Sequence, residues 1–562
     1  MRLKLLLLGV GFSCALVSAQ QEQPAIVLKA MKAELDRSIG YLKTQGTPPY
    51  FLSYSIVDQQ RTSVRATFGV LQSSGEGHTR QLALGLRVGD YSLDNTHEIR
   101  GDYASYQSRY AYIAIPIEDN SDALRTILWL ATDTRFKRAV DEYTKVKTNK
   151  AVKVKEEDVS DDFSHEQPSL YIEKPKMLKI DRPLWEAKLK NYTRLFREHP
   201  NIFGGDASME ALVETKYFIS SEGTMLQTSA TYVRLMIYAL SKADDGMELP
   251  RFESFFAFSP DGMPTDEQVI RKIQTMIDDL EKLRVAPLVD PYSGPAILTG
   301  GAAGVFFHEV LGHRVEGHRQ KLETEGQTFK KKLGERVLAD SIDVVYDPTS
   351  DHLNGSDLSG YYKYDDEGVK AQRVAVIENG ILKRFLMGRT PIEKFSSSNG
   401  HGRGQAGFQP VSRQSNLIIQ SKNPVPSPKL RQMLIDECLK KQKPYGLLFA
   451  QIEGGFTMTG RTMPNSFNVL PLVVYRVHTD GRPDELVRGV DLVGTPLTVF
   501  GKVTAAGDDP ETWYGYCGAE SGSVPVSQTC PSIFVSEVEV QKKDKSQDKP
   551  PILPAPFAKK AN

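Results

Sequence analysis

The sequence predicts an α+β protein with more than one domain, and three observations support this fold class. The chain has 562 residues, more than a single compact core usually holds. Residues 25–287 alternate stretches of helical periodicity with stretches of strand-like alternation. From about residue 289 the pattern changes to short apolar runs separated by Gly, Asn and Asp turns. We therefore expect an N-terminal α/β-mixed domain followed by a C-terminal antiparallel β-rich domain.

Four stretches of the N-terminal domain have helical periodicity: residues 25–46, 122–146, 184–200 and 265–287. Thr265 or Asp266 can cap the last of these helices. Residues 51–60 and 64–73 have the alternation of half-buried strands, and residues 213–223 and 232–241 continue it. Residues 147–183 are rich in Lys, Glu, Asp and Pro, which indicates a solvated connection or a surface excursion.

The C-terminal domain contains the strongest hairpin signal in the chain. Residues 374–386 have the pattern of a strand, an Asn379-Gly380 turn and a second strand. The domain is expected to span residues 289–542, after an N-terminal domain of residues 20–288. The Lys- and Pro-rich residues 543–562 have the composition of a disordered tail.

The first 19 residues have the three parts of a secretory signal peptide. Arg2 and Lys4 supply the positive start, residues 5–17 form an apolar core, and a small-residue cleavage site ends at Ala19. This apolar run is shorter than the roughly 20 residues that a membrane-spanning helix needs. We therefore expect an exported protein, periplasmic or secreted, without stable membrane insertion.

The overall composition argues against one class of function. Lys plus Arg and Asp plus Glu are 70 each, so the formal net charge is zero. That balance disfavours a nucleic-acid binder held mainly by phosphate contacts. Without the signal peptide the chain keeps Cys438, Cys517 and Cys530. An odd number of cysteines in an exported protein leaves at least one outside any internal disulfide.

Residues 306–321, "FFHEVLGHRVEGHRQK", hold three histidines and two glutamates. The zinc signature HExxH places two histidines four residues apart on one helical face, whereas His308 and His313 are five apart. At about 100° per residue they would diverge by about 140° on a regular α-helix. A π-type turn, or a helix that ends near Gly312, would bring both imidazoles to one ion.

The residue types in this stretch suit zinc chemistry. Neutral imidazoles hold zinc without cancelling its charge, and Glu309 occupies the position where zinc peptidases keep their general base. The same residues are also compatible with a solvated, charged helix face that binds no metal. His318 is a competing ligand, and nothing in the local pattern excludes it.

A catalytic zinc needs a third protein ligand. Cys517, in "YGYCGAESGSVPVSQTC", could supply it as a thiolate, because the flanking glycines let the backbone approach closely. Alternatively, Cys517 could form a disulfide with Cys530, which is plausible in an oxidising compartment. The composition of this stretch does not decide between a ligand and a disulfide.

Three motifs resemble, in order and spacing, the TldD/PmbA family of metallopeptidases. They are "GPAILTGGAAGVFFHEVLGHRVEG", "YKYDDEGVKAQRVAVIENGILKRFLMGR" and "YGYCGAESGSVPVSQ". The resemblance runs through most of residues 290–540, and residues 25–285 fit an α+β domain more weakly. It implies a C-terminal metallopeptidase domain of TldD/PmbA type.

The resemblance implies that Zn²⁺ is held by His308, His313 and Cys517, and that Glu309 activates the attacking water. A disulfide between Cys517 and Cys530 would destroy that metal site, so we expect none.

Two positions depart from the family pattern. The family's cysteine stands in a Cys-Gly-Lys context, whereas this chain has Ala519 after Gly518. Relatives have Asp where this chain has His318, so the resemblance gives His318 no role.

The resemblance also carries expectations about activity and partners. The sister branch, PmbA/TldE, lacks the zinc motif, so this chain resembles the catalytic TldD branch. Family members work as dimers, often TldD with TldE, around a narrow chamber for unstructured peptides. We therefore expect a zinc-dependent peptidase for short or unfolded peptides, either a homodimer or a heterodimer with a TldE/PmbA-like subunit. An exported chain would share the family's chemistry but not its cytoplasmic pathways.

The alternative function is a non-catalytic peptide-binding partner with a structural or vestigial zinc, which a fourth protein ligand such as His318 would favour. Three further stretches carry no assigned role. Asp365–Gly368 has the composition of a turn. Residues 398–407, around His401 and Arg403, are expected to form a mobile loop that could line a chamber entrance. Residues 453–460 could be an edge strand for peptide pairing or a bulge.

Overall fold

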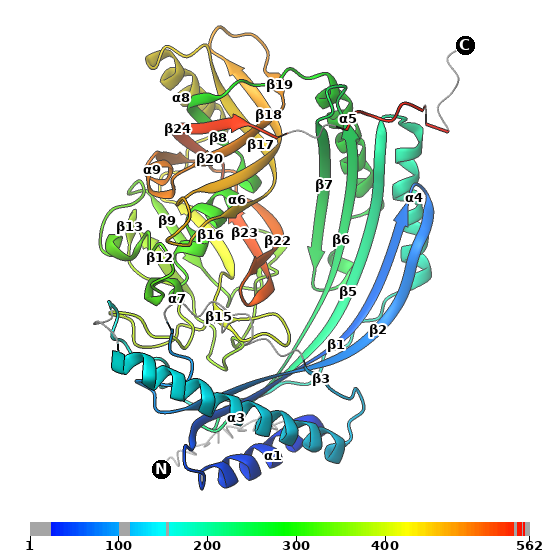
Figure 1. Cartoon of the computed structure of the whole chain (residues 1–562). Coiled ribbons are helices and arrows are strands. Elements are labelled where there is room, and N and C mark those ends of the chain that lie inside the picture. Colours follow the sequence, from blue (N-terminus) through cyan, green and yellow to red (C-terminus); the bar gives the residue numbers. More distant parts are fainter. Residues whose placement is uncertain (1–23, 100–112, 153–156, 545–547, 554, 557–562) are drawn as a thin grey trace, which may run out of the picture.

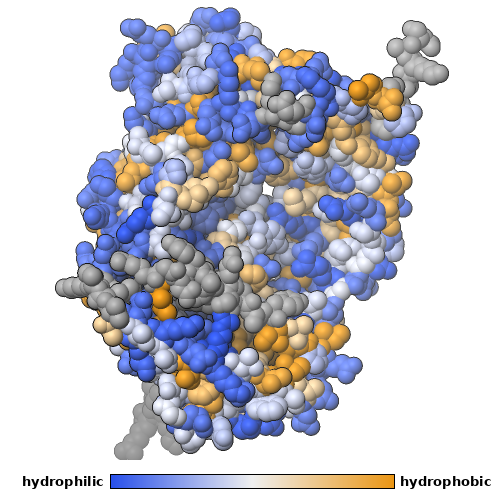
Figure 2. Space-filling view, viewed as in Figure 1, coloured by the Kyte–Doolittle hydropathy of each residue, from blue (hydrophilic) through white to orange (hydrophobic). Residues whose placement is uncertain are grey.

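The computed structural model describes residues 24–99, 113–152, 157–544, 548–553 and 555–556. The predicted signal peptide lies outside these ranges, as does part of the predicted tail. The described chain has the mixed α+β architecture that the sequence predicts (Figure 1). No helix in these ranges is long and apolar enough to cross a membrane. On the face drawn in Figure 2, hydrophilic and hydrophobic residues are interspersed over both parts of the molecule.

The N-terminal part is built on one sheet of long, mostly antiparallel strands. Its order is β3-β2-β1-β5-β6-β4, with β7 also paired to β6. The bounds are β1 Pro49–Thr67, β2 Val70–Val88, β3 Ile113–Ala114, β4 Leu170–Ile172, β5 Ile202–Ser220, β6 Met225–Lys242 and β7 Glu248–Ala257. In Figure 1 the long strands curve together around the C-terminal part.

Helices at two places cover this sheet: α1 (Ile26–Leu42), α3 (Ser121–Val152), α4 (Arg182–Arg194) and α5 (Asp266–Val285). α1 and α3 pack on β1 and β2 at one end, and α4 and α5 pack on β1, β5, β6 and β7 at the other (Figure 1). α5 starts with a capping box between Thr265 and Gln268, so Thr265 is the cap among the two predicted candidates.

Three expectations for the N-terminal part are corrected. Residues 64–73 are not one strand, because Phe68 (φ 44°) and Gly69 (φ 86°) form the turn of the β1–β2 hairpin. α3 continues past residue 146 to Val152. Residues 147–183 are not merely a solvated connection, because β4 pairs with β6 and Phe163 is buried. The polar composition gave no sign of this packing, because the side chains of Asp158, Ser160 and Glu166 form hydrogen bonds with the C-terminal part.

The C-terminal part contains two sheets with α6 (Gly300–Val310) between them. One sheet has the order β13-β12-β9-β16-β23-β22 and the other β17-β8-β24-β20-β18-β19, with β21 beside β24. Most pairs are antiparallel, whereas β16–β23 and β8–β17 are parallel. The Asn379-Gly380 hairpin is confirmed: Asn379 and Gly380 both have positive φ between β12 and β13.

The strand bounds of the first sheet are β9 Ile342–Tyr346, β12 Val374–Glu378, β13 Ile381–Leu382, β16 Asn416–Ser421, β22 Glu511–Ala519 and β23 Gly522–Cys530. Those of the second are β8 Tyr292–Leu298, β17 Tyr445–Thr457, β18 Phe467–His478, β19 Glu485–Val487, β20 Val490–Gly494, β21 Val503–Ala506 and β24 Ile533–Lys542. Shorter elements are β10 His352–Leu353, β11 Ser356–Asp357, β14 Gly402–Arg403, β15 Val411–Ser412, α7 His318–Lys321, α8 Ser427–Lys440 and α9 Pro496–Phe500. The 3-10 turns are η1 Leu195–Glu198, η2 Pro260–Gly262, η3 Gly312–Arg314 and η4 Lys330–Lys332.

A buried arginine joins the two parts. The guanidinium of Arg389 donates to both carboxylate oxygens of Glu222 and to the main-chain oxygen of Ser164. Arg389 and Arg87 each lie 3.8 Å from the ring centroid of Phe163. Cation–π contacts of this kind are worth more when water is excluded, so this cluster fixes residues 157–164 against the C-terminal part.

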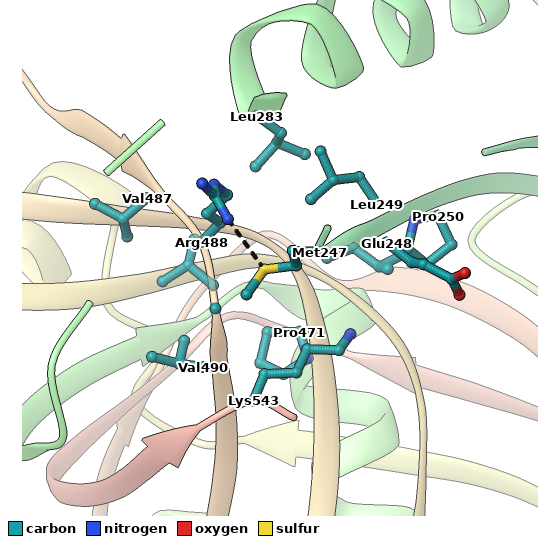
Figure 3. A pocket seen from close by; sticks show the side chains of 13 residues that line it. Met247, Glu248, Leu249, Pro250, Leu283, Pro471, Val487, Arg488, Val490 and Lys543 are labelled. Carbon is teal, nitrogen blue, oxygen red and sulfur yellow. Dashed lines mark hydrogen bonds between the residues drawn. The ribbon is translucent and has the colours of Figure 1, made fainter. Parts of the chain in front are cut away.

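A shallow pocket also lies between the two parts, where β7 and α5 approach β18, β19 and β20 (Figure 3). Arg488 reaches across it to Met247 Sδ at 3.4 Å and to the Asp245 carboxylate. Its lining is mostly aliphatic and includes none of the residues that the sequence analysis proposes for chemistry. The pocket is therefore part of the contact between the two parts of the chain and is separate from the candidate site.

Candidate metal centre

The HExxxH stretch does not continue as one helix. α6 ends at Val310, and the 3-10 turn η3 begins at Gly312. Of the two geometries that the spacing allows, the structure has the helix that ends near Gly312. The change of direction brings the His308 and His313 rings to a centroid distance of 5.1 Å.

Gly312 is required by packing as well as by the change in helix geometry. A Cβ at this position would lie 2.0 Å from Oε1 of Gln414. Gln414 is fully buried, accepts a hydrogen bond from Tyr346 and lies with Nε2 4.0 Å from Cys517 Sγ. Sequence reasoning did not find Gln414, and no local pattern around it marks a site.

The β22–β23 hairpin brings Cys517 to the two histidines. β23 lies against α6 so closely that a Cβ at Gly304 would be 2.9 Å from the Cβ of Gln528. His308, His313 and Cys517 each offer one donor atom, and these atoms lie within 4.8 Å of one another. Their residues are 7%, 8% and 1% exposed. The structure thus assembles the three predicted metal ligands into one buried group.

The Nδ1 atom of each histidine has a hydrogen-bond partner. His308 Nδ1 is 3.1 Å from the Gln528 amide, and His313 Nδ1 is 3.2 Å from Glu316 Oε2. His313 Nε2 is left facing Cys517 Sγ at 3.5 Å. Partners of this kind fix the tautomer and orientation of a ligating imidazole. Gln528 and Glu316 lie in the quoted motifs, but their residue types alone did not mark them as partners.

The buried group is charged. Burial raises the pKa of the Cys517 thiol, but His313, His308 and Arg413 together hold it well below its usual range. Burial opposes charge on His313, but Cys517 and Glu316 raise its pKa well above the usual value. The charges that face Cys517 thus favour its thiolate, the form that binds metals, and metal binding would displace a proton from the imidazole of His313.

Glu309 is nearly buried and has no hydrogen bond or ion pair on its carboxylate among the described residues. Its Cγ packs against Gly455 of β17, where an added Cβ would lie 2.7 Å away. Its main-chain oxygen accepts from Arg314 at 2.8 Å. The backbone is thus held in place while the carboxylate stays available for a proton transfer.

Comparison with known proteins agrees with this geometry. Residues 291–542 match the family model of the PmbA/TldA metallopeptidase C-terminal domain. This domain belongs to the PmbA/TldD family. The predicted resemblance is therefore confirmed for the part of the chain that holds the candidate metal centre.

Two curated relatives and one solved structure place the PmbA/TldD domain in context. A metalloprotease of Methanocaldococcus jannaschii is 33% identical over 41% of this chain and 47% of its own length. A zinc metalloprotease TldD homolog of Saccharolobus solfataricus is 27% identical over 44% and 51%. The chain thus spans about half the length of these relatives. TldE from Thermococcus kodakarensis shares the fold, with a TM-score of 0.60, 13% identity and coverage of 91% of this chain and 100% of that one.

Two residues named as alternatives lie outside the metal group of the PmbA/TldD domain. His318 Nε2 is hydrogen-bonded to the Glu520 carboxylate instead of facing the three donors. Cys530 lies opposite Glu511, whereas Cys517 lies opposite Val524. Six residues of strand separate the two positions, or about 20 Å at roughly 3.3 Å per residue, so the register keeps Cys530 from Cys517.

The expectation of a mobile loop at residues 398–407 is wrong. His401 and Arg403 are buried, and Gly402 and Arg403 form the strand β14. Polar and glycine-rich composition is shared by exposed loops and by buried turns whose polar groups are satisfied. Here His401 is bonded to Asn399 and Ser415, and Arg403 donates to the main-chain oxygen of Gln414.

The other two open stretches are assigned by the structure. Asp365–Gly368 is a turn, in which Asp365 accepts the main-chain N–H groups of Glu367 and Val369. Residues 453–457 belong to β17, whose pairing with β18 has several register shifts. β17 pairs with β8 only over residues 447–449. Within the described chain, the β17 segment beside Glu309 therefore has one edge without a partner strand.

Proposed function

We propose that this protein is a zinc-dependent peptidase that hydrolyses short or unfolded peptides. The observation that carries the proposal is the convergence of His308, His313 and Cys517 within 4.8 Å, with Glu309 next to the first ligand. Relatives named as a metalloprotease and a zinc metalloprotease support the reaction class and the metal. Two imidazole nitrogens and a thiolate are a donor set that suits zinc.

The surroundings of the three donors fit a zinc ion. An imidazole that gives Nε2 to a metal carries its proton on Nδ1 and needs an acceptor there. Glu316 provides one for His313. Gln528 provides one for His308 if its amide is rotated, and its Oε1 is buried without a partner in the described chain. Three protein ligands leave one position open, as in catalytic zinc sites.

The chemistry divides between the metal and the protein. When bound, zinc would polarise the scissile carbonyl and lower the pKa of a neighbouring water molecule. Glu309 would take the proton from the attacking water, because no other group in the described chain occupies its carboxylate. It would then give that proton to the leaving amine. The buried setting excludes bulk water and strengthens these electrostatic interactions.

The free edge of β17 supports a peptide substrate. Residues 451–456 run past Glu309 with main-chain groups on one edge that pair with no strand in the described chain. An extended peptide could add to this edge and present its backbone carbonyl to the metal centre. Folded proteins keep their backbone in internal hydrogen bonds, so the site would favour short or unfolded chains.

The non-catalytic alternative receives less support. It would be favoured by a fourth protein ligand that closed the site, and His318 was the candidate. His318 is instead directed at Glu520. We therefore keep the peptidase as the proposed function.

Two properties of the whole protein are part of the proposal. We infer that it works as a dimer, either with itself or with a TldE-like subunit, because TldE has the same fold over 91% of this chain. We also infer export, because of the predicted signal peptide. Light scattering of the purified protein tests the homodimer, which a monomer would contradict, and light scattering after a TldE-like subunit is added tests the heterodimer. Cell fractionation tests the second, and retention of the full-length chain in the cytoplasm would contradict it.

The deciding experiment measures zinc and hydrolysis on the same sample. The mature protein, purified without chelator, should contain about one zinc ion per chain. It should cleave a small protein after that protein is reduced and unfolded, but not while it is folded. Chelation should remove both zinc and activity, and added zinc should restore both. A zinc-loaded protein that leaves the unfolded substrate intact would favour the binding-partner alternative.

A further inference from the structure

Glu316 is a fully buried carboxylate directly behind the candidate metal centre, at 0% exposure. Its backbone is fixed by main-chain hydrogen bonds: Leu386 N–H donates to Val315, and Gly317 N–H donates to Leu386. The side chain therefore has a defined direction. A buried carboxylate is destabilising unless it is well paired, so the groups that contact Glu316 indicate its role.

His313 and two arginines surround the Glu316 carboxylate. His313 Nδ1 lies 3.2 Å from Oε2, Arg319 Nε donates to Oε2 at 2.8 Å, and Arg413 Nε lies 3.6 Å from Oε1. Glu316 therefore contacts one proposed metal ligand directly and shares its carboxylate with two arginines.

Both arginines also contact the β22–β23 hairpin, which carries the proposed ligand Cys517. Arg319 Nη2 donates to the carboxylate of Glu520, in the turn between β22 and β23. Arg413 donates to the main-chain oxygens of Cys517 and Gly522 and to Ser521 Oγ. The tip of the hairpin is thus tied back to Glu316 from two sides.

These contacts fix the position of Cys517 relative to His313. Cys517 lies 204 residues after His313, so no local structure sets the distance between their donor atoms. A hairpin tip held only by its own turn would have conformational freedom that metal binding must remove. Two arginines that share one carboxylate with His313 remove that freedom in advance.

We propose that Glu316 is the positioning residue that assembles the two halves of the metal centre. It orients His313 directly and holds the Cys517 hairpin through Arg319 and Arg413. The inference rests on the proposed function in one respect, namely that the assembled ligands bind zinc. The assembly itself concerns only residues of this chain and can be measured without a metal.

The first test compares Glu316→Gln with Glu325→Gln. Glu325 accepts from the same Arg319 at 2.8 Å but contacts neither a ligand nor the hairpin, so it is a matched control. Zinc affinity is measured by competition with a chromophoric chelator. We expect Glu316→Gln to bind zinc about 10–100-fold more weakly, the usual cost of an outer-shell partner. Glu325→Gln should bind zinc like the parent protein.

The second test follows the hairpin itself. Hydrogen exchange of residues 515–522, measured after zinc is removed, should be faster in Glu316→Gln than in Glu325→Gln. Cobalt(II) substitution adds a spectroscopic readout, because thiolate ligation gives a charge-transfer absorption. At equal cobalt occupancy that absorption should be weaker in Glu316→Gln, since the thiolate is held less firmly.

Glu520→Gln keeps the proposal testable if Glu316→Gln does not fold. This variant weakens the contacts of the hairpin to Arg319 and to His318 but leaves Glu316 in place, so it should speed exchange at residues 515–522 and weaken zinc binding by less than Glu316→Gln is expected to. Equal zinc affinity and equal exchange in the Glu316 and Glu325 variants would overturn the inference, as would unchanged exchange in Glu520→Gln. If the parent protein bound no zinc, the proposed function would fail, while the exchange comparison would still decide the positioning role.

Discussion

Cys517 and Cys530 lie on the two strands of one hairpin, and both are buried, but their thiols ionise in opposite directions. Burial raises the pKa of both. For Cys517, His313, His308 and Arg413 outweigh burial and hold the pKa well below its usual range. For Cys530, Asp509 adds to burial and the pKa is well above it. Burial therefore does not mark a ligand; the charges that face the thiol decide whether it can bind a metal.

The same contrast holds for two buried histidines of this domain. Burial lowers the pKa of both His313 and His401. Cys517 and Glu316 reverse that effect for His313, whereas His401 faces neutral groups and the positive Arg403, and its pKa falls to about 3. The domain thus has a charged region around His313 and Cys517, which suits metal binding. It also has a region around His401, called the neutral region below because its histidine stays uncharged.

Replacing each cysteine by alanine tests the contrast most directly. Cys517→Ala should lower the zinc content from about one ion per chain to almost none, because losing a ligand costs more than the roughly 10–100-fold of an outer-shell partner. Cys530→Ala should keep its zinc. Metal analysis of both variants after dialysis against zinc-free buffer gives the answer. Equal zinc in the two proteins would remove Cys517 from the proposed ligand set.

Glu309→Gln separates catalysis from metal binding. The variant should keep its zinc, because Glu309 is not among the three donors, and should lose about 10²–10⁴-fold in kcat/KM, the usual contribution of general acid–base catalysis. Hydrolysis of an unstructured peptide and zinc analysis are measured on the same preparation. Near-parent activity with zinc bound would rule out Glu309 as the general base.

The adjacent glycines of β17 provide a finer comparison. A Cβ at Gly455 would lie 2.7 Å from Glu309 Cγ and 2.8 Å from the main-chain oxygen of Asn468. A Cβ at Gly454 would meet nothing within 4 Å. Gly455→Ala should displace Glu309 and lower kcat/KM by up to about 10²-fold, as small displacements of catalytic groups do. Gly454→Ala should leave activity nearly unchanged, and equal effects would contradict the proposed packing.

Features set by neighbouring residues could be predicted from the sequence. The start of α5, with Thr265 or Asp266 as its cap, and the Asn379-Gly380 hairpin depend on a few consecutive side chains, and both were predicted from the sequence. The end of α6 before Gly312 was one of two geometries that the histidine spacing allowed. The Phe68-Gly69 turn was missed, because phenylalanine rarely takes a positive φ and gives no turn signal.

Features set by distant contacts could not be predicted from local pattern. Cys517 was chosen among the cysteines only through the family resemblance, since its partners lie about 200 residues away. Gln414 and Gln528 gave no signal, because a glutamine next to a metal ligand looks like any other glutamine. His401 was misplaced on a mobile loop for the same reason: its composition is compatible with exposure, and only the tertiary contacts bury it.

The neutral region should give the protein a pH dependence that the metal centre does not explain. His401 has a folded pKa of about 3, because burial and Arg403 disfavour its charge, against about 6.5 in an unfolded chain. Between these values the unfolded state binds a proton that the native state does not. Stability therefore falls as the pH is lowered from 6.5 towards 3, by up to about 1.4 kcal/mol per pH unit from this group.

His401→Gln removes this titration while it keeps a neutral polar side chain beside Asn399 and Ser415. The free energy of unfolding in urea is measured at pH 6.5 and pH 5 for both proteins, with fluorescence as the probe. The decrease between the two pH values should be smaller in the variant by about 2 kcal/mol, even if the variant is less stable at both. If stability decreased equally in the parent protein and the variant, His401 would take up a proton in the folded state. Its neighbours would then stabilise the charged imidazole, as Cys517 and Glu316 do for His313.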